Sequence, residues 1–296
     1  MKLRGIEKLR EKLPEYSGWR LLLLPLRGVG ACAIGLFFMV FLDILPRAFR
    51  LPFLVLMEPL LPPIGSALCL CIGVLLVRGV WLNRDKWLRE MGGGAYAHAL
   101  RRGACGVFLI GTVVIHIYLS KGTLLLGPPA NPLTTILSTS VLAAIGVPWI
   151  LDVVVRMTGG FVLVVLSLAT MRSTVCTFGV DYMLLVYLYY PEESDLQSHD
   201  IYSVIRHPAY FGAVLFALGG FLFRLSIYSV VLVLIVFAGL KYHVTMEESE
   251  LIERFGESYR EYMSEVPGLY VRPKDLRVFM RFLTSLGENH DPAASE

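Results

Sequence analysis

Long apolar stretches with almost no charged side chains constrain this chain more than any other feature. A bilayer core about 30 Å thick is crossed by roughly 20 apolar residues in a helix, so most of these stretches are long enough to span it. The last stretch is interrupted near Arg224 and predicts two spans. The stretches cover residues 28–45, 64–82, 104–119, 134–155, 159–170 and 210–240.

The apolar stretches are continuous, and this excludes one class of membrane fold. Strands of a membrane barrel alternate apolar and polar residues, whereas helices in lipid satisfy their own backbone hydrogen bonds. Hydrophobic residues make up 55% of the chain and charged residues 17%, against roughly 45–50% and about 25% in soluble domains. We therefore expect an all-α, polytopic bundle of about six to eight spans in a membrane, with residues 51–61 too short and too rich in proline to assign.

Basic residues gather in two places, within the first twenty residues and across residues 84–102. The positive-inside rule assigns both to the cytoplasm. The net charge of +3 is mild and predicts no nucleic-acid partner. The N-terminal segment shows no clear cleavage site, so we expect no removable signal peptide. With these two segments on one face, the expected spans put the loop before Arg206 on the other face, unless residues 51–61 or 158–190 are miscounted.

We divide the chain into membrane helices of unassigned role (residues 1–157), a core that carries the candidate site residues (158–273) and a C-terminal tail (274–296). His116 lies within a span, where we expect packing or an interhelical hydrogen bond. Asp152 and Arg156 stand four residues apart and predict a local ion pair. The five cysteines lie in or beside apolar stretches and are expected to be free and buried.

Two polar segments on either side of a helical hairpin predict a site. Arg206-His207-Pro208 precedes the first helix of the hairpin, and Glu247-Glu248 follows the second. Carboxylates this close to an apolar span need partners or a charged ligand. Residues 247–262 have apolar side chains at helical spacing and predict an amphipathic helix that Val266-Pro267 terminates. Motifs for nucleotide loops, serine hydrolases and zinc enzymes are missing, so we expect no metal site.

Both segments resemble the signatures of one enzyme superfamily. The run at residues 196–212 ends in Arg-His-Pro-x-Tyr-x-Gly, and the second run reads Glu-Glu-x-x-Leu, Phe-Gly, Tyr-x-x-Tyr and Val-Pro. In this order they are similar to the isoprenylcysteine carboxyl methyltransferase and phospholipid N-methyltransferase superfamily, over residues 172–273. The resemblance implies a membrane methyltransferase that uses S-adenosylmethionine, with a pocket open to the cytosol, capped by the C-terminal helix and reached by a lipid or lipidated substrate between spans.

The resemblance also implies residue roles. Glu247 and Glu248 would hold the ammonium or ribose hydroxyls of the cofactor, and Arg206 would face its carboxylate or the acceptor. If the acceptor is an amine, His243 or Glu247 could accept its proton, which a carboxylate acceptor does not require. The residues implied to line the cofactor pocket are Leu196, His199, Tyr202, His207, Tyr210, Gly212, Glu247 and Glu248.

Two positions differ from the family pattern. Asp200 stands where the family has glycine, and His243 stands where isoprenylcysteine enzymes have an arginine that can neutralise a substrate carboxylate. The acceptor therefore stays open between a prenylcysteine-type carboxylate and a phospholipid amine.

Other functions also remain open. Sterol reductases, which bind NADPH, have a related layout, although Ala209 and Ala213 replace their diagnostic residues. A non-catalytic membrane scaffold is a further alternative. A transporter would need polar residues at mid-bilayer on several spans and an internal repeat, which the sequence does not show.

Overall fold

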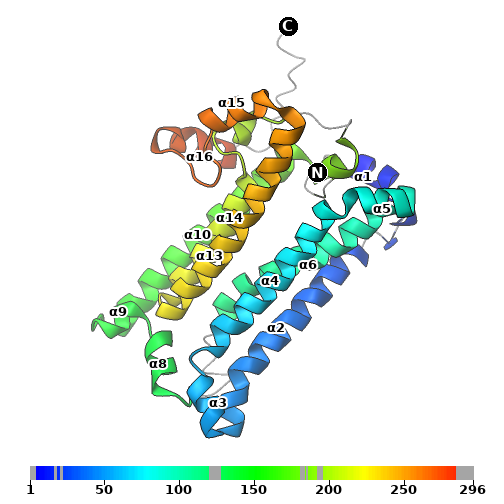
Figure 1. Ribbon diagram of the computed structural model, residues 1–296. Coiled ribbons are helices and arrows are strands. Elements are labelled where there is room, and N and C mark those ends of the chain that lie inside the picture. Colours follow the sequence, from blue (N-terminus) through cyan, green and yellow to red (C-terminus); the bar gives the residue numbers. More distant parts are fainter. Residues whose placement is uncertain are drawn as a thin grey trace.

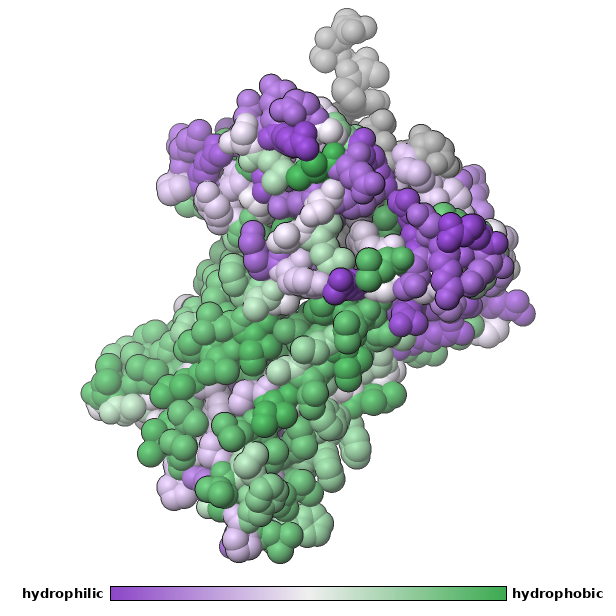
Figure 2. Space-filling view, viewed as in Figure 1, coloured by the Kyte–Doolittle hydropathy of each residue, from purple (hydrophilic) through white to green (hydrophobic). Residues whose placement is uncertain are grey.

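The computed structural model describes residues 5–16, 19–20, 23–119, 128–180, 184, 186–191 and 196–284. Within these ranges the regular elements are all helices, which confirms the all-α prediction. Figure 1 shows the long helices lying side by side, and Figure 2 shows an apolar body beneath a polar cap.

Five helical segments in the described residues are long and apolar enough to cross a membrane. Their principal helices, together with the shorter α13, form the bundle: α2 (Leu23–Phe49), α4 (Leu61–Leu82), α6 (Ala95–Leu119), α10 (Trp149–Phe178), α13 (Pro208–Arg224) and α14 (Ile227–Phe255). Small helices lie at the two ends of the bundle (Figure 1). Those at the polar end include α1 (Ile6–Lys12), α5 (Arg84–Met91), α15 (Glu257–Glu265) and α16 (Leu276–Thr284), and those at the opposite end are α3 (Pro52–Met57), α8 (Pro132–Ser138) and α9 (Val141–Ala144).

The path of the chain resolves the conflict over which membrane face carries the loop before Arg206. Residues 51–61 contain α3 and a turn rather than a span. The expectation of separate spans at 134–155 and 159–170 is wrong, because the first run forms α8 and α9 and then joins the second in the single helix α10. Gly146, with φ of 81°, and Pro148 separate α9 from α10. With α13 counted as a crossing, α1, α5 and the segment before α13 lie at one end (Figure 1).

The predicted hairpin break near Arg224 is confirmed. Leu225 adopts a left-handed conformation with φ of 45° directly after α13. Ser226 then caps α14, because its hydroxyl oxygen accepts from the Ser229 backbone N–H at 3.4 Å while the Ser229 hydroxyl accepts from the Ser226 N–H at 3.0 Å.

The amphipathic helix expected over residues 247–262 is not continuous. Its first half forms the last turns of α14, and Gly256, with φ of 58°, separates these turns from α15. The predicted stop at Val266-Pro267 is confirmed, since α15 ends at Glu265. Residues 276–284 of the expected tail form α16, which packs on α10 and on the short η5 (Asp200–Ser203). The boundary expected at residue 157 falls within α10.

Small residues let the helices approach closely. A Cβ on Gly106 of α6 would stand 2.7 Å from the carbonyl oxygen of Gly73 on α4. A Cβ on Gly220 of α13 would stand 2.8 Å from the ring of Tyr118 on α6. Such close backbone contacts are typical of helix packing in lipid.

Buried polar pairs join the helices away from the polar cap. Nε2 of His116 on α6 lies 2.9 Å from Oδ2 of Asp43 on α2, as expected for an interhelical hydrogen bond. The predicted pair of Asp152 and Arg156 is confirmed, with two contacts of 2.8 Å. The five cysteines are free, although Cys71 is exposed and three others are only partly buried.

Candidate functional site

The segment that carries Arg206 and His207 is held by the chain that follows α15. The Arg206 N–H donates to the carbonyl of Pro267 at 2.9 Å, and the His207 N–H donates to that of Gly268 at 3.1 Å. Pro208 then starts α13, where its missing N–H costs nothing. This backbone pairing, which we call the clasp, fixes both polar side chains at the end of the helical hairpin.

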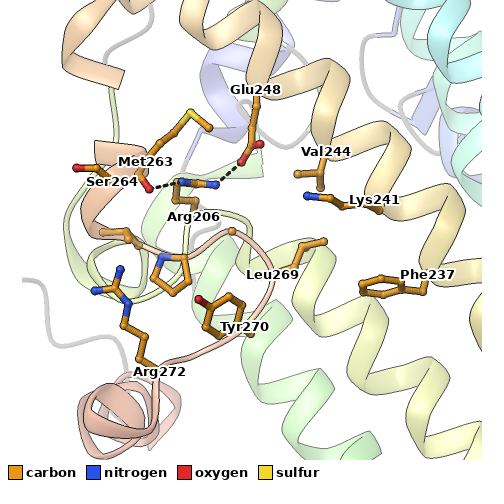
Figure 3. Close-up of a pocket in the computed structure, with 13 residues that line it drawn as sticks. Arg206, Phe237, Lys241, Val244, Glu248, Met263, Ser264, Leu269, Tyr270 and Arg272 are labelled. Atoms are coloured by element: carbon orange, nitrogen blue, oxygen red, sulfur yellow. Dashed lines mark hydrogen bonds and ion pairs between the residues drawn. The ribbon is translucent and has the colours of Figure 1, made fainter. Parts of the chain in front are cut away.

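Glu248 joins the two polar segments. Its Oε1 accepts from Nη2 of Arg206 at 2.6 Å and lies 3.0 Å from Nε2 of His207. Nη1 of Arg206 donates to the Met263 carbonyl at 2.8 Å (Figure 3). Gly268 is needed beside this pair, because a Cβ there would stand 3.1 Å from Arg206 Nη2. The meeting of the two segments predicted from the sequence is therefore present.

Glu247 points to a different set of partners. The Tyr187 hydroxyl donates to Glu247 Oε1 at 3.1 Å. Burial, and then the charge of Glu247, raise the pKa of Tyr187 well above its usual value, so this phenol remains a donor. Oε2 of Glu247 is buried, lies 4.0 Å from Nδ1 of His207 and has no hydrogen-bond partner among the described residues.

A cluster of rings borders Glu247. The ring centroid of His243 lies 5.4 Å from that of Tyr210 and 5.1 Å from that of Trp81, both in edge-on contacts. The Tyr210 and His207 centroids are 5.7 Å apart. Trp81 belongs to α4, so the N-terminal half of the chain contributes a wall of the site. Its ring N–H is buried without a hydrogen-bond partner among the described residues.

Two more of the predicted pocket residues, Tyr202 and Leu196, contact the tyrosines of α15. Tyr202 is buried, and its carbonyl accepts from the Tyr262 hydroxyl at 2.6 Å. Burial first, and then the charge of Glu247, raise the pKa of Tyr202. Leu196 packs beside Tyr259 and Tyr262 on the inner side of α15.

The other two predicted pocket residues lie differently. His199 is 58% exposed, with its Nε2 3.9 Å from the Asp200 carboxylate. Gly212 faces α10, where a Cβ would stand 3.1 Å from the side chain of Met171, and its carbonyl accepts from Ser167 at 2.7 Å. The close approach that Gly212 permits is therefore between two helices.

Asp200 adopts the backbone conformation for which the family uses glycine. Its φ is 52°, in the left-handed region. Aspartate tolerates this region better than most side chains but less well than glycine. The turn therefore keeps its shape without the glycine.

An open pocket of about 670 Å³ lies beside the ion pair of Arg206 and Glu248 (Figure 3). One wall is a face of α14, and the other is the end of α15 with the loop that follows it. Cavities of this size hold small molecules or cofactors. The lining residues are Arg206, Phe237, Lys241, Val244, Glu248, Met263, Ser264, Val266, Pro267, Gly268, Leu269, Tyr270 and Arg272.

The side chains around Glu247 have the chemistry to hold a cationic, hydroxyl-bearing cofactor. A buried carboxylate oxygen without a donor is costly and calls for a ligand that supplies one. Glu247 Oε2 is such an acceptor. The ring N–H of Trp81 is likewise a buried donor without a hydrogen-bond partner among the described residues. Tyr187 and Trp81, which the sequence analysis did not assign to the site, are found only through contacts between distant segments.

Comparison with known proteins agrees with this geometry. Residues 155–258 match the family described as phospholipid methyltransferase. Two curated relatives, from Oryza sativa subsp. indica and subsp. japonica, are both named probable protein-S-isoprenylcysteine O-methyltransferase. Each is 26% identical over 108 residues, which are 36% of this chain and 56% of the relative. The chain thus spans about half the length of the relatives it matches, and no solved structure matches it.

The match begins inside α10 and ends just after Gly256, so it includes α13, the clasped residues Arg206 and His207, and both glutamates. The helices that precede α10 lie outside it. Residues 155–258, about a third of the chain, are therefore similar to the phospholipid methyltransferase family.

Proposed function

We propose that this protein is an integral membrane methyltransferase that transfers a methyl group from S-adenosylmethionine to a lipid or lipidated acceptor. The observation that carries the proposal is the buried Glu247 Oε2, which lies near His207 and finds no hydrogen-bond donor among the described residues. The family match and the names of the two relatives support it.

The residues of the chain bind the methyl donor and the acceptor and align them with each other. This alignment is most of what methyl transfer requires. When bound, S-adenosylmethionine supplies an electrophilic methyl group on a sulfonium, and S-adenosylhomocysteine is left after transfer. Glu247 accepts a hydrogen bond from an ammonium or hydroxyl of the ligand, while Tyr187 holds the other carboxylate oxygen. Glu248 fixes the ring of His207 through Nε2, which leaves Nδ1 toward Glu247.

The acceptor chemistry decides whether a base is needed. A carboxylate oxygen attacks the methyl carbon directly, and the S–C bond breaks as the O–C bond forms. An ammonium must first lose a proton, because it has no lone pair. His243 and Glu247 lie where one of them could take that proton, and Trp81 and Tyr210 hold the His243 ring by edge-on contacts.

The site is proposed to face the cytoplasm. It lies at the end of the bundle that carries α1 and α5 with their basic residues (Figure 1). Cytoplasmic loops are enriched in lysine and arginine. This placement would give the site access to a soluble methyl donor.

Calorimetry on the purified chain in detergent tests the proposal. We expect S-adenosylmethionine and S-adenosylhomocysteine to bind, and Glu247→Gln to weaken binding about tenfold or more, which is about 1.4 kcal/mol. Glu253→Gln is the matched control, because Glu253 lies on the same helix but is exposed. Equal losses in both variants would contradict the role of Glu247.

Two further outcomes would replace the proposal. Binding of NADPH instead of the methyl donor would indicate a reductase, and binding of neither would favour a scaffold. Transfer of a labelled methyl group to phosphatidylethanolamine or to a prenylated cysteine in parallel reactions would then identify the acceptor class.

A further inference from the structure

A second hollow, of about 350 Å³, lies in the part of the chain that the family match does not cover. It opens between α2, α4 and α6 at their polar ends. Four of its six lining residues are basic, and most of its accessible surface is apolar. We call it the basic hollow, and its lining residues are Arg27, Leu76, His98, Arg101, Arg102 and Cys105.

Two guanidinium groups in the basic hollow converge on one oxygen. Nη1 of Arg27 donates to the Tyr16 hydroxyl at 3.2 Å, and Nη1 of Arg101 donates to the same hydroxyl at 3.4 Å. Tyr16 is buried, with 6% of its surface exposed, so its position is set by packing. Like charges repel at this range. An arrangement that gathers them around a fixed hydroxyl is suited to an anion.

No carboxylate neutralises these arginines within the described parts of the chain. Arg27, Arg101 and Arg102 take part in none of the ion pairs found there, whereas most other basic clusters of the protein contain acids. The Arg102 guanidinium instead lies 6.0 Å from the centroid of the Trp87 ring. Three guanidinium groups therefore border the hollow without a carboxylate partner among the residues that the structure describes.

The floor of the hollow faces the lipid-covered part of the bundle. Cys105 lies one turn from Arg101 and Arg102 on α6, and Leu76 contributes the α4 side of the hollow. Two exposed apolar side chains continue along α4 at helical spacing from Leu76, namely Ile72 and Leu68. Figure 2 shows the border between the polar cap and the apolar body at this level of the bundle. A ligand that fits both parts has an anionic head and an apolar tail.

We propose that the basic hollow binds the phosphate of an anionic membrane phospholipid, whose acyl chains lie against α4 below Leu76. Arginine forks match phosphate oxygens in pairs, and basic pockets between membrane helices at the cytoplasmic surface recognise such head groups. The site is separate from the cluster around Glu247, and its ligand is not the methyl acceptor. The proposal does not depend on the reaction that the protein catalyses.

Lipid retention in nanodiscs tests this site. The full chain is placed in phosphatidylcholine discs with a minor fraction of phosphatidylglycerol, and the lipids that remain bound are identified by native mass spectrometry. We expect the wild type to retain phosphatidylglycerol selectively, and Arg27→Gln/Arg101→Gln to reduce this retention about tenfold. The control Lys86→Gln/Arg89→Gln removes the same charge from exposed positions on α5 and is expected to retain the lipid.

A second pair of variants keeps the test decisive if the glutamine variant does not fold. Arg27→Lys/Arg101→Lys preserves the charge but loses the planar forks, and should also lower retention. Equal loss in the α5 control would overturn the proposal, because it would indicate diffuse attraction of anionic lipid. Retention that survives both arginine variants would overturn it as well. Displacement of the lipid by inorganic phosphate would identify a soluble phosphate as the ligand.

Discussion

Adjacent glutamates serve different partners because successive residues of a helix point about 100° apart. Glu248 forms an ion pair with Arg206, lies within hydrogen-bond distance of His207 Nε2 and ties two distant segments together. Glu247 Oε1 accepts a hydrogen bond from Tyr187, and its Oε2 is buried without a hydrogen-bond partner in the described parts of the chain. At the residue scale, one carboxylate therefore builds the site and its neighbour is left for a ligand.

Replacement of Asp200 tests the cost of its backbone conformation. Asp200→Gly should raise the free energy of unfolding by up to about 1 kcal/mol, because glycine adopts a positive φ without strain. Asp200→Val should lower it by about 1–2 kcal/mol, since a β-branched residue is strained there. Thermal unfolding in detergent measures both. Identical melting temperatures for the two variants would contradict strain at this turn.

The sequence predicted the polar residues of the site better than its rings. Arg206, His207 and the two glutamates are conspicuous as charges beside apolar spans, and the motif spacing brings them together. Tyr187 and Trp81 carry no such signal, because aromatic residues are common at membrane interfaces. Their part in the site depends on how α4 and α14 pack, which the local sequence does not reveal.

At the element scale, the contact between α4 and α6 depends on glycine at the crossing point. Gly106→Ala should destabilise the protein by about 1–3 kcal/mol, because the added carbon would meet the Gly73 carbonyl and Val77 at 2.7 Å. Gly111→Ala on the same helix is the control. A Cβ added at Gly111 would have no atom within 4 Å. This substitution should therefore raise the free energy of unfolding by up to about 1 kcal/mol, because alanine has the higher helix propensity. Unfolding in detergent distinguishes the two, and equal effects would exclude close packing as the cause.

The docking of α16 gives another prediction. Phe279 is 4% exposed and packs against Phe211 and the η5 segment, whereas its neighbour Met280 is 40% exposed. Phe279→Ala should cost about 3 kcal/mol locally and speed amide exchange in residues 276–284. Met280→Ala should change exchange little. If both variants exchange at the wild-type rate, α16 is not held by Phe279.

The helices were predictable where the apolar pattern was strong. They were less predictable where a single residue ends one helix and starts the next. The hairpin was placed correctly because Arg224 interrupts an apolar run. The break at Gly256 was missed, since apolar spacing continues across it from α14 into α15. Hydropathy likewise predicted a single span over α8, α9 and the start of α10, because their residues are as apolar as those of a span.

At the scale of the whole molecule, the five candidate spans and α13 together give an even number of crossings, with the N-terminal helix and the site at one end of the bundle (Figure 1). A reporter fused to either terminus should therefore report the same compartment. One inserted at Gly146, between α9 and α10, should report the opposite compartment. Termini that report different compartments would show that one of the six helices does not cross. The sequence could not decide this, because length and hydropathy do not resolve short or bent helices.

The clasp also sets an order of events during synthesis. Arg206 and His207 leave the ribosome about sixty residues before the Pro267 and Gly268 carbonyls that their N–H groups need. Until that later stretch emerges, the first polar segment lacks its backbone partners, although Glu248 has left the ribosome about twenty residues earlier. The six helices of the bundle can thus be made and inserted before the clasp forms, so the nascent chain is anchored in the membrane before its candidate site is complete.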